Sequence, residues 1–358
     1  MRARQPQALP RYWLLLCLLL ALSNLLAGLF GGLQRLGTIS TDLGGQALGG
    51  HGVFMMAGFF ASLISLERAV ALRRGVWVPL CSGAAGLLAA LGLWTWAAWA
   101  WVLAALGLLG LYLWAARYRA VSLPLAVEAS GAVALLWAAL AFALGEAGQA
   151  RWGWSLFLVL TIVGERRELM RLRPLPHWAA QVFLWAWGLL LGVALLMGPQ
   201  PELAARLGWS VLGLLALWLL RFDLARLQWR MPGWAGHTAI CLLLGYVWLL
   251  AAALAGLLGQ GHAGGVAWHL LWLGFVFAMV FGHAPLMLPA LAGLSPRHSR
   301  WALLPLGVMG LSLLLRTLAW LSGHPGLLSL AGVGHALSLL LFGLTMVWLV
   351  KTGANRRS

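Results

Sequence analysis

The chain has 358 residues, of which 62% are hydrophobic and only 9% are charged. Soluble domains average about 45–50% apolar and about 25% charged residues. So little charge cannot cover so much apolar surface in water, which excludes a soluble enzyme and a disordered protein. The 24 basic residues outnumber the 8 acidic ones. They fall between apolar runs, where membrane topology and lipid headgroups explain them better than nucleic acid does.

Twelve apolar runs follow one another along the chain, separated by short connections without a long polar segment. A membrane-spanning helix needs about 20 apolar residues, whereas a lipid-facing strand would alternate. The sequence therefore predicts an all-α polytopic membrane protein with about twelve transmembrane helices, in which 1–358 forms a single integral membrane domain in a lipid bilayer. The predicted spans are 12–34, 47–66, 76–95, 97–116, 123–145, 152–165, 178–198, 203–220, 234–258, 265–288, 301–321 and 327–350.

The basic residues predict the orientation of these spans. If the N-terminus is cytoplasmic, twenty Lys and Arg residues fall on the cytoplasmic side, and three, Arg35, Arg151 and Arg206, fall on the other. Cytoplasmic loops carry an excess of Lys and Arg. Both termini are therefore expected in the cytoplasm. A missed or extra helix would move the basic residues of all later loops to the opposite side, so the bias also supports the number of spans.

The ends of the second, sixth and tenth spans resemble one another. Glu67-Arg68, Glu165-Arg166 and His283-Ala284 occupy matching places, four spans apart. This pattern predicts three tandem four-helix repeats, covering 1–119, 120–230 and 231–358. The alternative is that any span leaving the membrane at the cytoplasm ends in apolar residues followed by Arg.

Two families of membrane proteins share these features. Twelve helices in three four-helix arcs resemble subunit I of the haem–copper oxidase superfamily. His51, Met55 and the Gly58-Phe59 pair match the signature of the NnrS family of haem- and copper-containing membrane proteins linked to nitric oxide stress, although Val53 and Phe54 replace its second His and its Glu. The segments HGVFMMAGF, LERAVAL, VGERREL and GFVFAMVFGHAPLMLPAL look like an NnrS-like family of bacterial membrane proteins. This resemblance implies the bacterial inner membrane, haem and copper.

Histidines inside predicted spans are the first candidates for a functional site. Ionisable groups within a membrane are energetically costly and rare, so a function is the first hypothesis for each of them. At about 1.5 Å rise per residue, His51 and His269 lie within about 3 Å of the same depth, in the outer leaflet. His335 lies nearer the middle of the membrane. Haem–copper subunits hold a low-spin haem between helices two and ten, so the resemblance makes His51 and His269 the leading haem pair, with His335 as the substitute. Hydrogen-bonded packing is the alternative role for each.

Arg316 lies in the outer half of the eleventh span, where no Asp or Glu shares its depth. A buried guanidinium needs a counter-charge, which a haem propionate would supply. We therefore expect Arg316 to face the interior of the bundle and to bind the cofactor. The alternative is that it snorkels to the headgroups or binds backbone carbonyls.

A second layer of candidates lies nearer the cytoplasm. His237 and Cys241 are four residues apart, as are Met279 and His283, so each pair shares a helix face. Soft sulfur with imidazole suits Cu(I), although Met also fills gaps between helices. Glu128 lies at the same depth, either as a proton-relay group or as a partner for Arg together with Glu67 and Glu165. Those Glu–Arg pairs are expected to fasten helix ends.

The expected function is that of an inner-membrane haem protein, with copper as a further candidate cofactor, in nitric oxide response or electron transfer. The predicted sixth and seventh spans contain no His, and span ten has no His-x-His, so oxygen reduction is not expected. The sequence does not identify a redox partner. Two other classes stay open: a transporter or metal-handling permease, and a cofactor-free structural or assembly protein.

Overall fold

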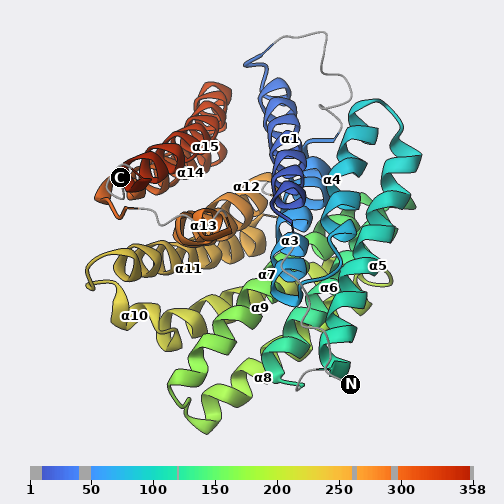
Figure 1. Ribbon diagram of the computed structural model, residues 1–358, viewed down its shortest axis with the longest axis vertical. Helices are drawn as coiled ribbons and strands as arrows, with labels where there is room; N and C mark the ends of the chain where they lie inside the picture. The colour runs from blue at the N-terminus through green and yellow to red at the C-terminus, as the bar shows by residue number, and fades with distance from the viewer. Residues whose placement is uncertain (1–9, 40–49, 119–120, 260–263, 292–296, 355–358) are drawn as a thin grey trace. The chain divides into compact units, whose positions relative to one another are not determined.

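The computed structural model describes residues 10–39, 50–118, 121–259, 264–291 and 297–354. These ranges are almost entirely helical and contain no strand. The chain divides into two compact units, Met1–Glu168 and Leu169–Ser358, which are treated separately below (Figure 1). Both termini, and His262, lie outside the described residues, so the orientation of the chain stays a prediction.

The first unit consists of six long helical segments joined by short turns. Its elements are α1 (Arg11–Arg35), a π-helical segment η2 (Phe54–Phe60) continuous with α3 (Ala61–Leu72), α4 (Trp77–Ala90), α5 (Trp94–Tyr118), α6 (Leu123–Ala143) and α7 (Ala147–Leu169).

The second unit contains six further long segments. Its elements are η3 (Met170–Leu172), α8 (His177–Leu196), α9 (Pro201–Phe222), α10 (Ala225–Gln228), α11 (Trp234–Leu258), α12 (Gly264–His269), a π-helical segment η4 (Leu270–Val276), α13 (Phe277–Leu291), η5 (Arg300–Leu303), α14 (Leu304–Ser322) and α15 (Pro325–Ala354).

Each predicted span overlaps a helical segment, and ten helices in the described ranges are long and apolar enough to cross a membrane. The other two segments are α4, which has only 14 residues, and α7, which carries charged residues toward both ends. The predicted third span, 76–95, was too long. The chain reverses at Gly92, whose φ of +80° is readily adopted only by glycine, so α4 ends at Ala90.

Small residues let the helices of the first unit approach closely. Asn24 on α1 donates from Nδ2 to the carbonyl oxygens of Leu20, at 2.8 Å, and Gly83, at 2.9 Å. A Cβ at Gly58 or Gly86 would collide with the Asn24 side chain. Small residues at helix interfaces are typical of membrane bundles, where close backbone packing replaces the hydrophobic effect.

The two π-helical segments occupy equivalent sequence positions. The same 216 residues separate Phe54 from Leu270 and Gly58 from Gly274. This offset also relates Glu67 to His283, the pair aligned from sequence. π-Helical turns are rare, and they are frequently found at functional sites. Each here follows a candidate histidine, His51 or His269, within three residues.

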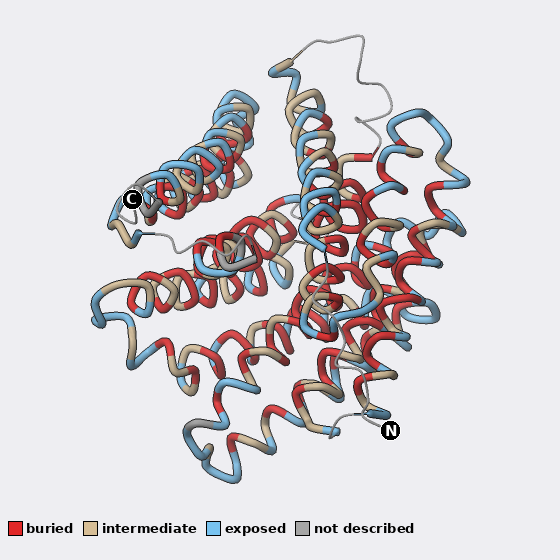
Figure 2. The backbone as a smooth tube through the Cα atoms, in the orientation of Figure 1, coloured by how far each residue is buried: buried red, intermediate tan, exposed pale blue. Residues whose placement is uncertain are grey.

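Exposed residues run along the helices of both units (Figure 2), and many of them are large and apolar. Examples are Leu19 on α1, Leu311 on α14 and Leu340 on α15, each more than half exposed. A monomer in water rarely leaves such extended apolar faces uncovered, whereas lipid tails cover them without cost. The exposed apolar faces of the structure and the apolar composition of the sequence therefore both indicate a membrane protein.

Candidate functional site

His269 and His335 meet inside the second unit. His269 is the last residue of α12, directly before the π-helical turn, and His335 lies in α15. Their ring centres are 6.3 Å apart, and the ring planes are within 21° of parallel. Packed aromatic rings commonly have their centres about 4.5–7 Å apart, so this is also an ordinary packing distance, and the hydrogen bonds of the ring nitrogens are what distinguish the pair.

Each ring is held through its Nδ1 atom. The Nδ1 of His269 lies 2.6 Å from the carbonyl oxygen of Gly265, one turn earlier on the same helix. The Nδ1 of His335 lies 2.6 Å from Ser312 Oγ, which itself donates to the Met309 carbonyl at 2.8 Å. A carbonyl oxygen only accepts, so His269 carries Nδ1–H. The Ser312 hydroxyl accepts from Nδ1–H of His335 when its own proton is donated to Met309, and on that assignment the lone pair of each ring is on Nε2.

The Nε2 atom of His335 is an unsatisfied acceptor. The side chain is 6% exposed, and this nitrogen has no hydrogen-bond partner in the described part of the chain. A buried polar atom without a partner costs about 1–3 kcal/mol. An imidazole with Nδ1–H anchored and Nε2 unused is the arrangement that metal-ligating histidines show.

The spacing of the two rings fits a shared metal ion. A histidine–metal bond is about 2.0–2.1 Å long, and two such bonds in line, plus the distance from each ring centre to its nitrogen, separate the ring centres by about 6.4 Å. The observed separation is 6.3 Å. His269 and His335 would therefore be able to hold one metal group between them if each ring turned its Nε2 toward it.

Arg316 completes this site with a positive charge. It follows Ser312 by one turn of α14, is only 9% exposed, and lies within electrostatic range of His335. Its Nε has no hydrogen-bond partner, and no described acid pairs with its guanidinium. The side chain therefore points into protein, as expected from the sequence. A buried guanidinium without a counter-charge is a site for an anion.

Close packing of α14 against α15 positions these groups. A Cβ at Gly334 would lie 2.7 Å from Ser312 Cβ, so glycine is needed beside His335 for the two helices to approach. Ser338 Oγ donates to the Pro305 carbonyl at 2.7 Å on the same interface. Sequence analysis missed Ser312. The signal that could have found it is its spacing of four residues from Arg316, which places both on one face.

His51, the other predicted haem ligand, belongs to the first unit. Its Nδ1 lies 2.5 Å from the carbonyl oxygen of Gly28. A Cβ at Gly32 would lie 2.9 Å from the His51 ring, so α1 needs glycine there. His51 thus has the same Nδ1 anchoring as the other two histidines. Its pairing with His269 stays a prediction, since the two residues lie in different units.

The inner candidates of the second unit come together only in part. His237 donates from Nε2 to the Phe281 carbonyl at 3.0 Å, and Cys241 Sγ lies 3.8 Å from the same nitrogen. His283 instead binds the backbone carbonyl of Met279 on its own helix, at 2.9 Å. In the described ranges, no three His, Cys, Asp or Glu side chains converge closely enough to hold a metal ion.

A charged cluster occupies the first unit. The Arg68 guanidinium is 3.0 Å from Glu128 Oε2 and 3.5 Å from Glu165 Oε1, and its Cζ lies 5.2 Å from the centre of the Tyr112 ring. Of the two roles left open for Glu128, the structure shows the pairing with an arginine, which Glu165 shares. These contacts tie α3 to α6 and α7.

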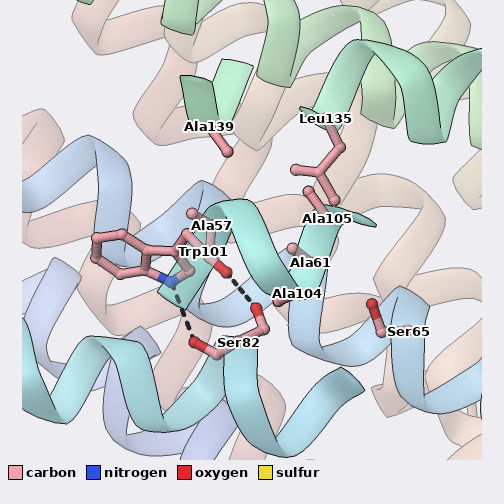
Figure 3. Close-up of a pocket in the computed structure, with 9 residues that line it drawn as sticks. All are labelled: Ala57, Ala61, Ser65, Ser82, Trp101, Ala104, Ala105, Leu135 and Ala139. Atoms are coloured by element: carbon pink, nitrogen blue, oxygen red, sulfur yellow. Dashed lines mark hydrogen bonds between the residues drawn. The ribbon is translucent and has the colours of Figure 1, made fainter. Parts of the chain in front are cut away.

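A small cavity lies further along the same helices (Figure 3). Trp101 Nε1 donates to the Ser82 carbonyl at 3.0 Å, and Ser82 Oγ donates to the Ala57 carbonyl at 2.7 Å beside it. The cavity has room for about one water molecule. Its other walls are mostly alanine, together with Ser65 on α3 and Leu135 on α6.

In the described ranges the protein is helical, with helices long and apolar enough to cross a membrane, and it brings the half-buried His269 next to the buried His335, with the buried Arg316 on a neighbouring helix. The chain belongs to the family described as "Domain of unknown function (DUF8744)", whose model matches residues 11–351. No curated protein and no solved structure matches the chain.

Proposed function

We propose that the protein is a multi-pass haem protein of the bacterial inner membrane, with about twelve transmembrane helices and both termini in the cytoplasm. The observation that carries this proposal is the spacing of His269 and His335, together with the unsatisfied Nε2 of His335. The basic-residue bias supports the orientation. The resemblance to NnrS-like and haem–copper proteins supports the choice of haem over other metal groups.

Each residue of the site has a distinct role in this proposal. His269 and His335 are the axial ligands, while Gly265 and Ser312 fix the tautomer in which Nε2 binds the metal. Arg316 binds a propionate through charge-assisted hydrogen bonds, which offsets the cost of its own burial. A haem bound in this way supplies one-electron transfer at a potential set by its ligands and surroundings.

Ligation by two histidines favours electron transfer over direct nitric oxide chemistry at this site. Reactive metal centres keep one coordination position open, whereas two protein ligands close both axial positions. The protein would then pass electrons to or from a separate redox partner during the response to nitric oxide. His51 remains the alternative ligand opposite His269, as the haem–copper resemblance implies.

A metal-handling permease is the second candidate function. It is supported by the 3.8 Å contact of His237 with Cys241 and by the Nδ1 of His237, which is buried and unpartnered among described residues. Imidazole and thiolate together suit Cu(I). A permease of this kind needs no haem, so a single preparation of purified protein, examined for haem and for copper, distinguishes the two candidate functions.

The test is a visible absorption spectrum and metal analysis of the detergent-purified protein. The haem proposal predicts a Soret band with iron in stoichiometric amount. Copper without a Soret band would contradict it and favour the permease. Neither metal in protein purified from cells supplied with iron, copper and haem precursor would contradict both and leave a cofactor-free role.

A further inference from the structure

The ion-paired cluster of the first unit extends from the protein surface to its interior. The Glu165 side chain is 39% exposed, Arg68 is 17% exposed, and Glu128 is only 7% exposed. Glu165 is therefore the member of the cluster that reaches the surface of the unit, and Glu128 is the most enclosed. The three side chains come from α7, α3 and α6 and are linked by the two ion pairs already described.

The charges of this cluster do not balance. One guanidinium contacts two carboxylates, so the group is negative unless one carboxylate holds a proton. Burying a net charge costs several kcal/mol, and a group that can neutralise itself by binding a proton does so. The charged neighbours are mixed: Glu67 lies beside Arg68, Glu168 within range of Glu128, and Arg166 beside Glu165.

Two hydroxyl groups next to the cluster have no hydrogen-bond partner in the described structure. Tyr112 is fully buried, and its hydroxyl faces Glu128 without forming a well-aligned bond. Thr161 lies one turn before Glu165 on α7, is 2% exposed, and is also unpartnered. Buried hydroxyls without partners mark positions where internal water or a transferred proton is accommodated.

The cavity of Figure 3 is lined in part by two of the helices that carry the cluster, α3 and α6. Ser65 precedes Arg68 by three residues, and Leu135 follows Glu128 by seven, so the cavity wall and the cluster share faces of α3 and α6. At about 1.5 Å rise per residue, seven residues correspond to about 10 Å. A water-sized space therefore lies further into the unit, about two helical turns beyond the cluster.

We propose that Glu165, Arg68, Glu128 and Tyr112 form a proton-binding site that is loaded from the surface of the first unit. A proton delivered by hydronium forms an O–H bond on Glu165 and leaves a water molecule behind. When Glu128 holds the proton instead, the O–H bond of Glu165 is broken and one on Glu128 is formed, while Arg68 and the Tyr112 hydroxyl keep their own protons. This site is independent of the haem proposal, since it lies wholly in the other unit.

The test is infrared spectroscopy of the purified full-length protein in H2O and D2O at about pH 7, where an ordinary Glu is ionised. We expect a C=O band from a protonated carboxyl group that shifts in D2O without unfolding. Glu128→Gln and Glu165→Gln should each abolish the band, because each removes one of the two carboxyl groups that share the proton beside Arg68, while the neighbouring Glu67 and Arg166 are unchanged. Glu146→Gln, at an exposed turn of the same unit, is the matched control and should keep it. Tyr112→Phe should keep the band but shift its frequency.

Two results would overturn the proposal: no such band in the wild-type protein, or a band that survives in either single variant. Size-exclusion chromatography establishes that each variant is folded. If Glu128→Gln does not fold, Glu165→Gln makes the same test, because the Glu165 side chain reaches the surface and its replacement is better tolerated.

Discussion

The imidazole rings of His269 and His335 lie 6.3 Å apart, centre to centre, although 66 residues separate them in the chain. Each ring is oriented by a hydrogen bond at Nδ1, from His269 to Gly265 and from His335 to Ser312. Arg316 lies on the same helix face as Ser312, buried and without an acidic partner among the described residues. A haem would use the two oriented imidazoles as ligands of its iron, and the guanidinium as the partner of a propionate.

Ser312→Ala should weaken the site without removing a ligand. Loss of the Ser312 hydroxyl leaves His335 Nδ1–H without its acceptor, which costs about 1–3 kcal/mol and frees the ring to rotate. We expect faster haem loss to apomyoglobin and a shifted reduction potential. Ser322→Ala removes an exposed hydroxyl that binds only its own helix, at the Leu318 carbonyl, and should change neither. Equal haem loss from both variants would contradict the role of Ser312.

Arg316→Leu should lower haem retention while leaving membrane insertion intact. An arginine at mid-span costs about 2.5–3.5 kcal/mol on insertion scales, so its removal eases insertion even as the propionate loses its partner. The readout is the haem-to-protein ratio of membranes expressing equal amounts of each variant. Arg300→Leu, at an exposed position before α14, is the control. Unchanged haem content in Arg316→Leu would show that the guanidinium does not hold a haem propionate.

Gly58→Ala should destabilise the first unit, because the added methyl group would collide with Asn24. Overpacking of this kind typically costs about 1–3 kcal/mol. Gly52→Ala is the matched control in the same helix, since its Cβ would meet nothing within 4 Å. Thermal unfolding in detergent should show a lower midpoint for Gly58→Ala alone. A similar midpoint for both variants would mean that α1 can move away from η2.

Both termini should lie in the cytoplasm. Fusions of a reporter that is active only in the cytoplasm, placed at residue 1 or 358, should be active, whereas a fusion in the turn at Gly145 should be inactive. The reason is the concentration of basic residues on one side of the predicted spans. An inactive terminal fusion would change the number of spans and reverse the depths assigned to the histidines.

The positions of the helices were predictable because apolar runs bounded by charges and glycines leave few alternatives in a membrane. The π-helical segments were not, because one extra residue in a helical turn leaves no hydropathy signal, although the Gly58-Phe59 and Gly274-Phe275 pairs share their register. Depth along the spans, together with the haem–copper resemblance, ranked His51 above His335 as the partner of His269. Which histidines meet depends on the lateral packing of helices, and depth along each span does not determine that packing.

The visible spectrum of three histidine variants tests the account most directly. With His269 and His335 as the axial ligands, His269→Ala and His335→Ala should each lose the Soret and α-band features of the low-spin form. His51→Ala and the exposed control His324→Ala should keep them. Wild-type protein without haem would contradict the account, and so would spectra that neither His269→Ala nor His335→Ala changes. If His51→Ala loses the Soret and α-band features and His335→Ala keeps them, the second ligand is His51 and not His335.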